Sequence, residues 1–529
     1  MPIFVGSNSD DSRIRSNRVG FAVSTANPGS ASEGDVYFNS SDSGLRAYDG
    51  SAWNAVGAGG GSLTAAASGT LEDGSTVIIN TDGTVGVVTA SAKTGQIFYG
   101  TPVTVATHST NFIDATYIGS GKIALAYRGP SSSYQGIVVI GTVSGTTISF
   151  GAPMIFHETE VEHIAIAYDE NADRILVTFE DLGNSQYGKA MVGQISGNNV
   201  TFGAETTYHS AEVKHSEISY DKNAQKCLIL YRDDGNGNRI RAKVATIDPS
   251  DNSVSFGSQA TCNDTSSNFF EVTYDENAQK HVIVYMDGQY NAKTATISGT
   301  SVSFGSELVL KGNNPNSNTI GVAYDASVQK SVAMYGDGND NYGYARVLTI
   351  SGTSLTAGSV QQITDQSYFN HAGITYDDSA KRIVVTYRSN TRGEFKLGNV
   401  SSDGTISFNT ISIFQDSGDI DESTPVYDSE NKKVVVCYAY DSDKPHAVVG
   451  DNTTTNLTAG NFLGFSDAAY TNGQTATIQL VGSVDDAQSG LTTGSKFFVQ
   501  KDGTLGLTTD SPNVLAGTAL SGTKIKIKK

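Results

Sequence analysis

Residues 163–203 show the alternation of apolar and turn-forming segments expected of four consecutive β-strands. HIAIAYD (163–169) and DRILVTF (173–179) are apolar on both faces, and KAMVGQI (189–195) and VTFG (200–203) follow them, separated by a Gly-Asn-Asn turn. A strand that is apolar on both faces must be covered on both faces. One four-stranded sheet cannot provide that cover, whereas a ring of similar sheets can.

The same pattern recurs seven times. A tyrosine ends the first strand of each copy, at intervals of 50 to 54 residues: Tyr117, Tyr168, Tyr220, Tyr274, Tyr324, Tyr376 and Tyr427. An aromatic residue ends each second strand, and Phe-Gly marks the fourth strand at 150, 202, 256 and 304, weakening to Ala357-Gly358 and Phe408-Asn409. Four strands per period of about fifty residues are typical of a β-propeller. A stacked solenoid is the rival, but it needs atypical capping repeats.

We therefore predict an all-β fold, a seven-bladed β-propeller of four-stranded antiparallel blades, flanked by small β modules at both termini. QIFYGTPVTVAT (96–107) resembles a fourth strand without a blade of its own, and the seventh repeat (421–451) shows only three strands. The early strand would complete the last blade and remove the free sheet edges. The alternative is that 456–465, which begins like the outer strand at 354–360, completes it.

This interpretation divides the chain into three parts. Residues 1–62 are polar and end in the flexible linker GAGGGS, so we expect an attachment or oligomerisation segment that builds no core of its own. Residues 63–95 and 464–529 should form one small β module, because INTDGTVGVVT (79–89) is echoed by VQKDGTLGLTT (499–509). The propeller should occupy residues 96–463.

Composition narrows the class of partner. With 54 acidic and 35 basic residues the net charge is −19, which disfavours nucleic acid because phosphate binding needs Lys and Arg. The three cysteines are scattered and lack metal-site spacing, so they suggest neither a disulfide framework nor a metal centre. The N-terminus lacks the features of a signal peptide and no apolar run approaches 18 residues, so we expect no membrane insertion.

Both termini resemble modules of bacteriophage structural proteins. Gly34-Asp35-Val36-Tyr37-Phe38-Asn39, followed by Tyr48, Gly50 and Ser51-Ala52-Trp53, is similar to short modules of tail-fibre and virion proteins. The segment from Ser489 to Thr492, then Phe498 to Leu505 and Leu515 to Ala519, resembles a module that ends structural proteins of marine phages. The resemblance implies a virion protein, assembled in the host cytoplasm and exposed on the particle.

The candidate recognition residues lie on one face of the predicted propeller. The second-to-third and fourth-to-first loops share that face and vary in length and chemistry, whereas the opposite face has only tight turns. Five tyrosines in these loops are the expected receptor-binding residues: Tyr134, Tyr187, Tyr290, Tyr342 and Tyr368. They either bind a sugar, by stacking on its ring, or merely cover loop backbone.

Catalytic and metal interpretations have weaker support. His157, His163, His209 and His215, with acidic neighbours, could ligate a divalent metal, but ordinary polar loop residues are the simpler interpretation. The Asp after six of the tyrosines precedes a tight turn, where Asp caps its own turn. No sialidase-type Asp box, GxSxG motif or calcium loop occurs. We expect no catalytic residues and no cofactor.

The functional expectation is a non-enzymatic phage structural protein, a tail fibre or surface appendage that contacts the host cell. Its partners would be other virion proteins, through the N-terminal segment, and a host surface glycan or protein. It would be a homo-oligomer, and fibre-like attachment suggests a trimer. The alternatives are a head-decorating or capsid-fibre protein, a glycan-degrading propeller enzyme, which would need an acid pair, and a bacterial adhesin.

Overall fold

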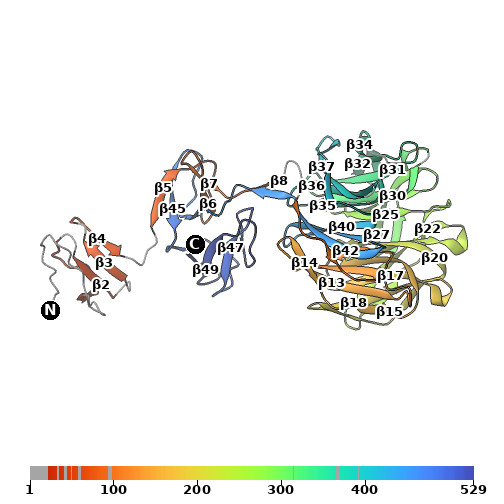
Figure 1. The fold of residues 1–529 in the computed structure, drawn as a ribbon, viewed down its shortest axis with the longest axis horizontal. Coiled ribbons are helices and arrows are strands. Elements are labelled where there is room, and N and C mark those ends of the chain that lie inside the picture. Colours follow the sequence, from red (N-terminus) through yellow and green to blue (C-terminus); the bar gives the residue numbers. More distant parts are fainter. Residues whose placement is uncertain are drawn as a thin grey trace. The chain divides into compact units, whose positions relative to one another are not determined.

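The computed structural model describes residues 22–32, 35–40, 44–48, 50–56, 61–92, 98–313, 315–364, 368–390 and 392–528. Within these ranges the regular elements are β-strands and two short 3₁₀ turns, η1 (Leu182–Asn184) and η2 (Asp234–Asn236), and no helix is long and apolar enough to cross a membrane. The chain divides into two compact units (Figure 1). Unit 1 comprises Met1–Ser91 and Thr454–Lys529, and unit 2 comprises Ala92–Thr453. The predicted end of the propeller at residue 463 is therefore wrong by ten residues, because 454–463 belong to unit 1.

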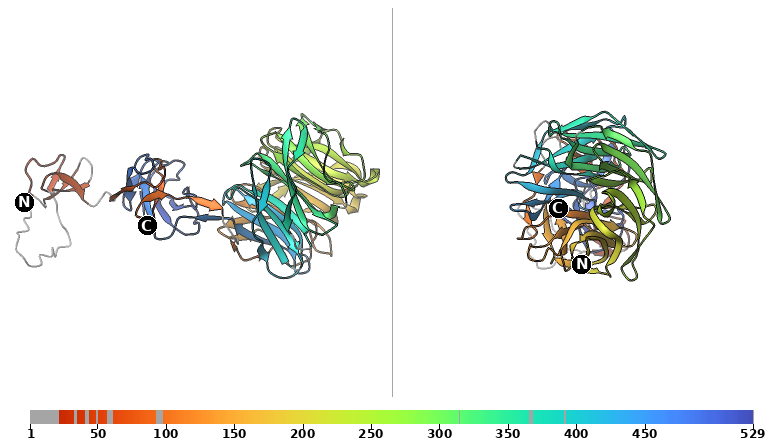
Figure 2. Two further views of the ribbon diagram at one scale, coloured as in Figure 1. Left: turned by 90° about the horizontal axis from the view of Figure 1, so that it is seen from above. Right: turned by 90° about the vertical axis from the view of Figure 1, so that its right-hand side faces the viewer.

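Unit 2 is a β-propeller, so the predicted fold class is confirmed. Its strands lie around a common centre (Figure 2). They form six sheets, five of five strands and one of nine, because β20 (Thr206–Asp221) runs from one repeat into the next. The innermost strands are β11 (Asp114–Tyr117), β16 (Val161–Asp169), the end of β20 (Thr206–Asp221), β25 (Phe270–Asp275), β30 (Pro315–Asp325), β35 (Asn370–Asp377) and β40 (Ile420–Asp428). The second strands are β12 (Lys122–Arg128), β17 (Arg174–Asp181), β21 (Lys226–Asp233), β26 (Lys280–Met286), β31 (Lys330–Asp337), β36 (Arg382–Ser389) and β41 (Lys433–Tyr440).

The outer half of each blade differs from the prediction in one respect, because the fourth strand is broken into two pieces. The third strands are β13 (Gly136–Ser144), β18 (Tyr187–Ser196), β22 (Arg239–Asp248), β27 (Tyr290–Ser298), β32 (Gly343–Ser351), β37 (Arg392–Val400) and β42 (Lys444–Asp451). Both pieces of a fourth strand pair with the third strand. They are β14 (Thr147–Phe150) with β15 (Met154–His157), β19 (Asn199–Phe202) with the start of β20, β23 (Ser253–Phe256) with β24 (Ala260–Asn263), β28 (Ser301–Phe304) with β29 (Leu308–Lys311), β33 (Ser354–Ala357) with β34 (Gln361–Thr364), and β38 (Ile406–Phe408) with β39 (Ser412–Gln415).

The N-terminal strand closes the ring. β9 (Phe98–Tyr99) and β10 (Val103–Thr104) pair with β42, so that Tyr99 lies opposite Gly450 and Val103 opposite Ala447. The first two residues of the predicted strand at 96–107 lie outside the described residues. The alternative closure by 456–465 is wrong, because β44 (Phe462–Ser466) pairs with a strand of unit 1. The inner strands β40 and β11 are neighbours, as consecutive inner strands are all round the ring.

The repeated tyrosines link adjacent blades. Tyr220 in the third blade accepts a hydrogen bond from the backbone N–H of Asn171 in the turn of the second, at 3.3 Å. Tyr117 in the first blade accepts one from Glu430 in the seventh, also at 3.3 Å. The contact thus spans the seam between the first and last repeats, which explains why a tyrosine hydroxyl is useful at this position.

Steric contact with the next blade explains why glycine follows phenylalanine in the fourth strands. At Gly257 a Cβ atom would lie 1.8 Å from the carbonyl oxygen of Thr300, in the third-to-fourth turn of the next blade, and Gly100 of the closing strand meets Thr146 in the same way at 1.7 Å. Asn409 is the exception. The next blade is the seventh, whose fourth strand comes from the N-terminal side of the propeller, so no third-to-fourth turn is there to approach Asn409.

The cores of the propeller lie between adjacent blades. One core joins Ile123 and Leu125 of β12 to Val435 and Cys437 of β41, across the seam. All eight residues of β17 are buried, as expected for a strand covered on both faces. The three cysteines are buried free thiols, which agrees with a packing role.

Unit 1 begins with a small sheet of four strands in the order β1 (Ala22–Ser24), β2 (Val36–Asn39), β3 (Gly44–Tyr48) and β4 (Trp53–Val56). The ring of Trp53 packs edge-on against Tyr37, with centroids 4.8 Å apart, and Tyr37 is buried. The expectation that residues 1–62 build no core is therefore wrong for this stretch. Residues 1–21 and the linker residues 57–60 lie outside the described part of the chain.

The rest of unit 1 is an internal duplication. One sheet has the order β5 (Ser62–Ala66), β45 (Thr475–Leu480), β44, β6 (Thr76–Ile79) and β7 (Val85–Val87). The other has the order β46 (Val484–Asp485), β50 (Ile525–Ile527), β49 (Leu515–Ala519), β47 (Lys496–Val499) and β48 (Leu505–Gly506). The two sheets share a core that includes Ile78, Phe465, Phe497 and Ile525.

The register of the two sheets agrees residue by residue. Gly464 lies opposite Val77 and Leu480, and Gly517 lies opposite the corresponding Phe497 and Ile527, each next to a β-bulge. The similar segments 79–89 and 499–509 form the same hairpin turn. The Thr84 N–H donates a hydrogen bond to Asp82 at 3.0 Å, and the Thr504 N–H donates one to Asp502 at 3.1 Å. The propeller is inserted between β7 and β44 of the first copy, where the second copy has only residues 507–514. Short strands β8 (Ala90–Ala92) and β43 (Thr453–Thr455), at the two crossings, pair with each other.

Candidate functional site

The two faces of the propeller are built differently. On one, here called the turn face, every first-to-second connection has four residues. Asp169 accepts hydrogen bonds there from the N–H groups of Asn171 and Ala172, at 3.0 and 2.9 Å, and Asp221 and Asp428 make the equivalent pairs. These carboxylates therefore cap their own turns, as predicted, and hold the scaffold.

The opposite face, here called the loop face, carries the second-to-third and fourth-to-first connections. The second-to-third connections range from two residues at 390–391 to seven at 129–135. Their chemistry also changes from blade to blade, whereas that of the turn face repeats. Variable loops on a rigid scaffold are the usual arrangement of a recognition surface.

The five predicted tyrosines have different environments. Tyr368 is 55% exposed, and Tyr134, Tyr187 and Tyr342 are half-buried. Tyr290 is wrong as a receptor-binding residue, because it is fully buried and its hydroxyl donates a hydrogen bond to the carbonyl oxygen of Met334 at 2.7 Å. The connection before it has only three residues, so Tyr290 is already the first residue of β27 and packs between blades.

Tyr134 belongs to an aromatic row near the start of the inner strands. The guanidinium carbon of Arg128 lies 4.6 Å from the centroid of Tyr134 and 5.0 Å from that of Phe112. The row continues from Phe112 to His163 at 4.7 Å, from His163 to His215 at 4.4 Å, and from His215 to Phe269 at 4.8 Å. Burial lowers the pKa of His163 to about 2 and that of His215 to about 4, so both imidazoles are neutral at physiological pH.

The sequence analysis missed this row, although a signal for it exists. Its members stand five residues before the repeated tyrosines, and aligning the repeats on the tyrosine gives one residue per blade: Phe112, His163, His215, Phe269, Thr319, His371 and Glu422. Five of these have a left-handed backbone, with φ between 43° and 58°. Such backbone is uncommon outside glycine, so the position is structurally special in those five blades.

Three acids lie two residues further along the inner strands and were also missed. Burial raises the pKa of Asp114 to about 7 and that of Glu271 to about 8, and it raises the pKa of Glu217 as well, with the neighbouring acids adding to each shift. Asp114 also accepts a hydrogen bond from the Ile166 N–H of the next inner strand, at 2.8 Å. Asp114 thus links the inner strands β11 and β16.

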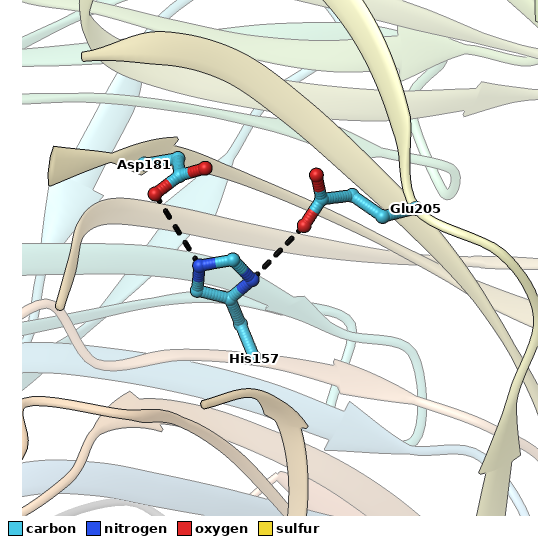
Figure 3. A group of neighbouring side chains, drawn as sticks. All are labelled: His157, Asp181 and Glu205. Atoms are coloured by element: carbon cyan, nitrogen blue, oxygen red, sulfur yellow. Dashed lines mark ion pairs between the residues drawn. The ribbon is translucent and has the colours of Figure 1, made fainter. Parts of the chain in front are cut away.

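The four candidate metal-binding histidines do not gather into one centre, because only His163 and His215 contact each other, whereas His157 and His209 lie in separate clusters. His157 Nε2 lies 3.3 Å from Asp181 Oδ1, and His157 Nδ1 lies 3.0 Å from Glu205 Oε2 (Figure 3). Lys189 Nζ lies 2.7 Å from Glu205 Oε1. His157 and Lys189 thus lie beside both carboxylates of this cluster.

The same arrangement recurs 52 residues later, where His209 Nε2 lies 3.2 Å from Asp233 Oδ1 and Arg241 Nε lies 3.5 Å from Asp233 Oδ2. In the following blades Asn263 and Lys311 take the histidine position and contact Asp287 and Asp337, at 3.1 and 2.5 Å. The contact keeps its place while its chemistry changes from blade to blade, so its role is structural. It links the fourth strand of one blade to the end of the second strand of the next.

No protein-family description matches this chain, and no curated protein matches it. Among solved structures, the BP39L lectin from Burkholderia pseudomallei aligns with a TM-score of 0.49 at 9% identity, over 70% of this chain and 99% of that one. A protein from Lactobacillus plantarum aligns with a TM-score of 0.44 at 14% identity, over 68% of this chain and 99% of that one. The WD40 domain of Toxoplasma gondii coronin aligns with a TM-score of 0.44 at 9% identity, over 74% and 91%. These similarities concern the fold alone.

Proposed function

We propose that this chain is a non-enzymatic structural protein of a bacteriophage particle, a tail fibre or surface appendage whose propeller contacts the host cell. Two features support this. The modules at both ends resemble those of phage structural proteins, and the propeller is inserted into one loop of a duplicated β module that the chain ends share. In this arrangement unit 1 serves attachment and the propeller serves recognition.

The observation that carries the recognition role is the difference between the two faces of the propeller. Every first-to-second turn on the turn face has four residues, and the aspartates that cap these turns serve the fold. The loop face changes in length, charge and aromatic content from blade to blade. Selection for folding alone would not require that one face vary while the other repeats, whereas recognition of an external ligand uses such variation.

The ligand of this face is a host surface glycan or protein. Tyr368 is exposed and Tyr134, Tyr187 and Tyr342 are half-exposed, so each can offer part of a ring to a ligand. An aromatic ring stacks on the apolar face of a sugar, while loop Asp and Asn side chains take its hydroxyls. Single contacts of this kind are weak, and several copies on one particle supply the avidity.

Unit 1 and the residues before it attach the chain to other virion proteins. The small sheet around Trp53 and the segment that precedes it are the attachment region, and a homo-oligomer, in the simplest case a trimer, is the assembly. Deleting residues 1–60 should leave both the propeller and the duplicated module folded but remove the chain from assembled particles. Normal incorporation of the truncated chain would refute this assignment.

Antibody labelling of intact particles tests the location. An Fab raised against the purified chain should decorate the tail or its appendages in electron micrographs and should block adsorption to host cells. Labelling confined to the head, with adsorption unaffected, would establish the decorating role instead. Absence of the chain from purified particles would refute the virion assignment altogether.

A further inference from the structure

Glu180, near the loop-face end of β17, is a buried carboxyl group without a partner. The residue is 1% exposed, and neither of its carboxyl oxygens has a hydrogen-bond partner within the described part of the chain. A buried charge without compensation is strongly unfavourable. Glu180 therefore requires either a proton or a cation.

Comparison with the same position in other blades shows which counter-charge Glu180 lacks. Glu180 directly follows the aromatic residue that ends the second strand, and the same position in three other blades holds Arg128, Arg232 and Arg388. Each of these arginines pairs with an acid: Arg128 with Glu162 at 2.7 Å, Arg388 with Asp421 at 2.9 Å, and Arg232 with Asp234. At Glu180 the charge is inverted. Lys214, in the next inner strand, compensates for it only in part: its charge opposes the rise in the pKa of Glu180, but its Nζ lies beside Glu212 and Asp234, at 3.4 and 4.0 Å.

Two further potential ligands face Glu180. Glu162 lies directly opposite it across the β16–β17 pair, and the register shifts just after Glu162, so that His163 follows without a partner of its own. His163 Nε2 lies 3.7 Å from Glu180 Oε2. One donor atom from each of the three residues lies within 4.8 Å of the other two. Arg128 engages Glu162 Oε1 and leaves the second oxygen of Glu162 available.

We propose that Glu162, His163 and Glu180 bind a divalent transition-metal cation, for which Zn²⁺ is the best fit. Zn²⁺ accepts imidazole nitrogens and carboxylate oxygens as ligands, at metal–ligand distances of about 2.0–2.2 Å, and the three side chains would move together to reach these distances. The cation would replace the missing arginine as the counter-charge of Glu180. Three protein ligands leave a fourth coordination position open to water or to a bound ligand.

The site differs from the neighbouring cluster of His157, Asp181 and Glu205. That cluster contains Lys189, which lies 2.7 Å from Glu205 and 4.0 Å from Asp181, so a lysine already lies beside both of its carboxylates. Both clusters include an acid of β17, Asp181 or Glu180, and both combine one histidine with two acids. The second therefore provides a matched control for the first.

The competing state is a protonated Glu180. Burial, followed by the charge of Glu162, raises the pKa of Glu180 to about 8, so a proton can occupy the place of the metal. Glu180→Gln reproduces the protonated form with nearly the same shape and should fold. Any loss of metal binding in this variant then reflects the missing ligand.

The test is titration of the untagged, full-length chain, stripped with a chelator and dialysed, with ZnCl₂ in a calorimeter. One equivalent of Zn²⁺ should bind, and Zn²⁺ should raise the melting temperature. Glu180→Gln and His163→Gln should each weaken binding by more than the roughly 10–100-fold that loss of an outer-shell partner costs and should remove the thermal shift. Glu205→Gln should bind as the wild type does.

Three results would overturn the proposal: no binding of Zn²⁺ by the wild-type chain, full binding by Glu180→Gln with an unchanged near-UV spectrum, or loss of binding in Glu205→Gln alone. The last would move the site to the cluster around His157. Titration with MnCl₂ and CaCl₂ distinguishes a transition-metal site from a general acidic one, because an imidazole ligand disfavours Ca²⁺. Equal affinity for Ca²⁺ would contradict the assignment.

Discussion

Replacing Gly257 by alanine tests the packing of one blade against the next. Gly257 separates the two pieces of the fourth strand of its blade, and its N–H donates a hydrogen bond to the carbonyl oxygen of Val244 at 2.8 Å. An added Cβ would lie 1.8 Å from the carbonyl oxygen of Thr300 and 2.9 Å from its carbonyl carbon. Because both obstacles are backbone atoms, no side-chain rotation relieves the clash.

The expected cost follows from this geometry. Cβ atoms essentially never approach another heavy atom within 3.0 Å, so the blades must separate locally by about 1.2 Å. Overpacking a tight contact typically costs about 1–3 kcal/mol, and strain on the bond to Val244 adds part of the ~0.5–1.5 kcal/mol of a hydrogen bond. We expect Gly257→Ala to lower the free energy of unfolding of the propeller by about 3 kcal/mol or more.

Gly151→Ala is the matched control. It occupies the same position in another blade, but its Cβ would lie 2.9 Å from the Cβ and carbonyl oxygen of Asn198. This variant should lose only about 1 kcal/mol. Urea unfolding followed by the near-UV circular dichroism of the tyrosines reports the propeller, while fluorescence of the single tryptophan, Trp53, reports unit 1. Equal destabilisation by both variants, or a shift in the tryptophan transition, would refute the interlock between blades.

Two further predictions concern the insertion and the central acids. Replacing residues 92–453 by two glycines should give a folded unit 1, because β8 and β43 already pair at the junction. The second copy of the module closes the same loop with a short segment. A fragment that melts without cooperativity would contradict the duplication. Burial raises the pKa of Glu271 to about 8, so the folded state holds this proton more tightly than the unfolded chain does. Its contribution to stability is therefore complete below about pH 4.5 and is lost as the pH rises to about 8. Glu271→Gln should flatten the decline of the urea midpoint between pH 5 and pH 8.5, and an unchanged pH profile would show that Glu271 does not titrate in this range.

Much of the propeller could be predicted because its repeats carry local signals. The spacing of Tyr117 and Tyr220 follows from a hydroxyl that bonds the turn of the preceding blade, and the Phe-Gly pairs follow from a steric contact with the next blade. Even Asn409, the apparent decay of that motif, marks the blade whose neighbour has no third-to-fourth turn. The orphan strand at 96–107 was found because the fourth-strand pattern occurs there without a repeat of its own.

The side-chain environments could not be predicted in the same way. Tyr290 looks like any other loop tyrosine in the sequence, and only the length of its connection places it between blades. The unpaired state of Glu180 depends on Arg128, Glu162 and Lys214, which belong to three different blades. Contacts of this kind arise from the closed ring and have no signature within a single repeat.

Adsorption of phage particles that carry altered loop-face tyrosines tests the central proposal most directly. Tyr134, Tyr187, Tyr342 and Tyr368 would be changed to Ala together, and the control would change Glu170 and Glu276, exposed on the turn face, where surface ion pairs contribute little to stability. With incorporation into particles equal in both cases, the tyrosine variant should adsorb to host cells at least about tenfold more slowly, and the control should match the wild type. Unchanged adsorption by the tyrosine variant would show that the loop face is not the receptor-binding surface.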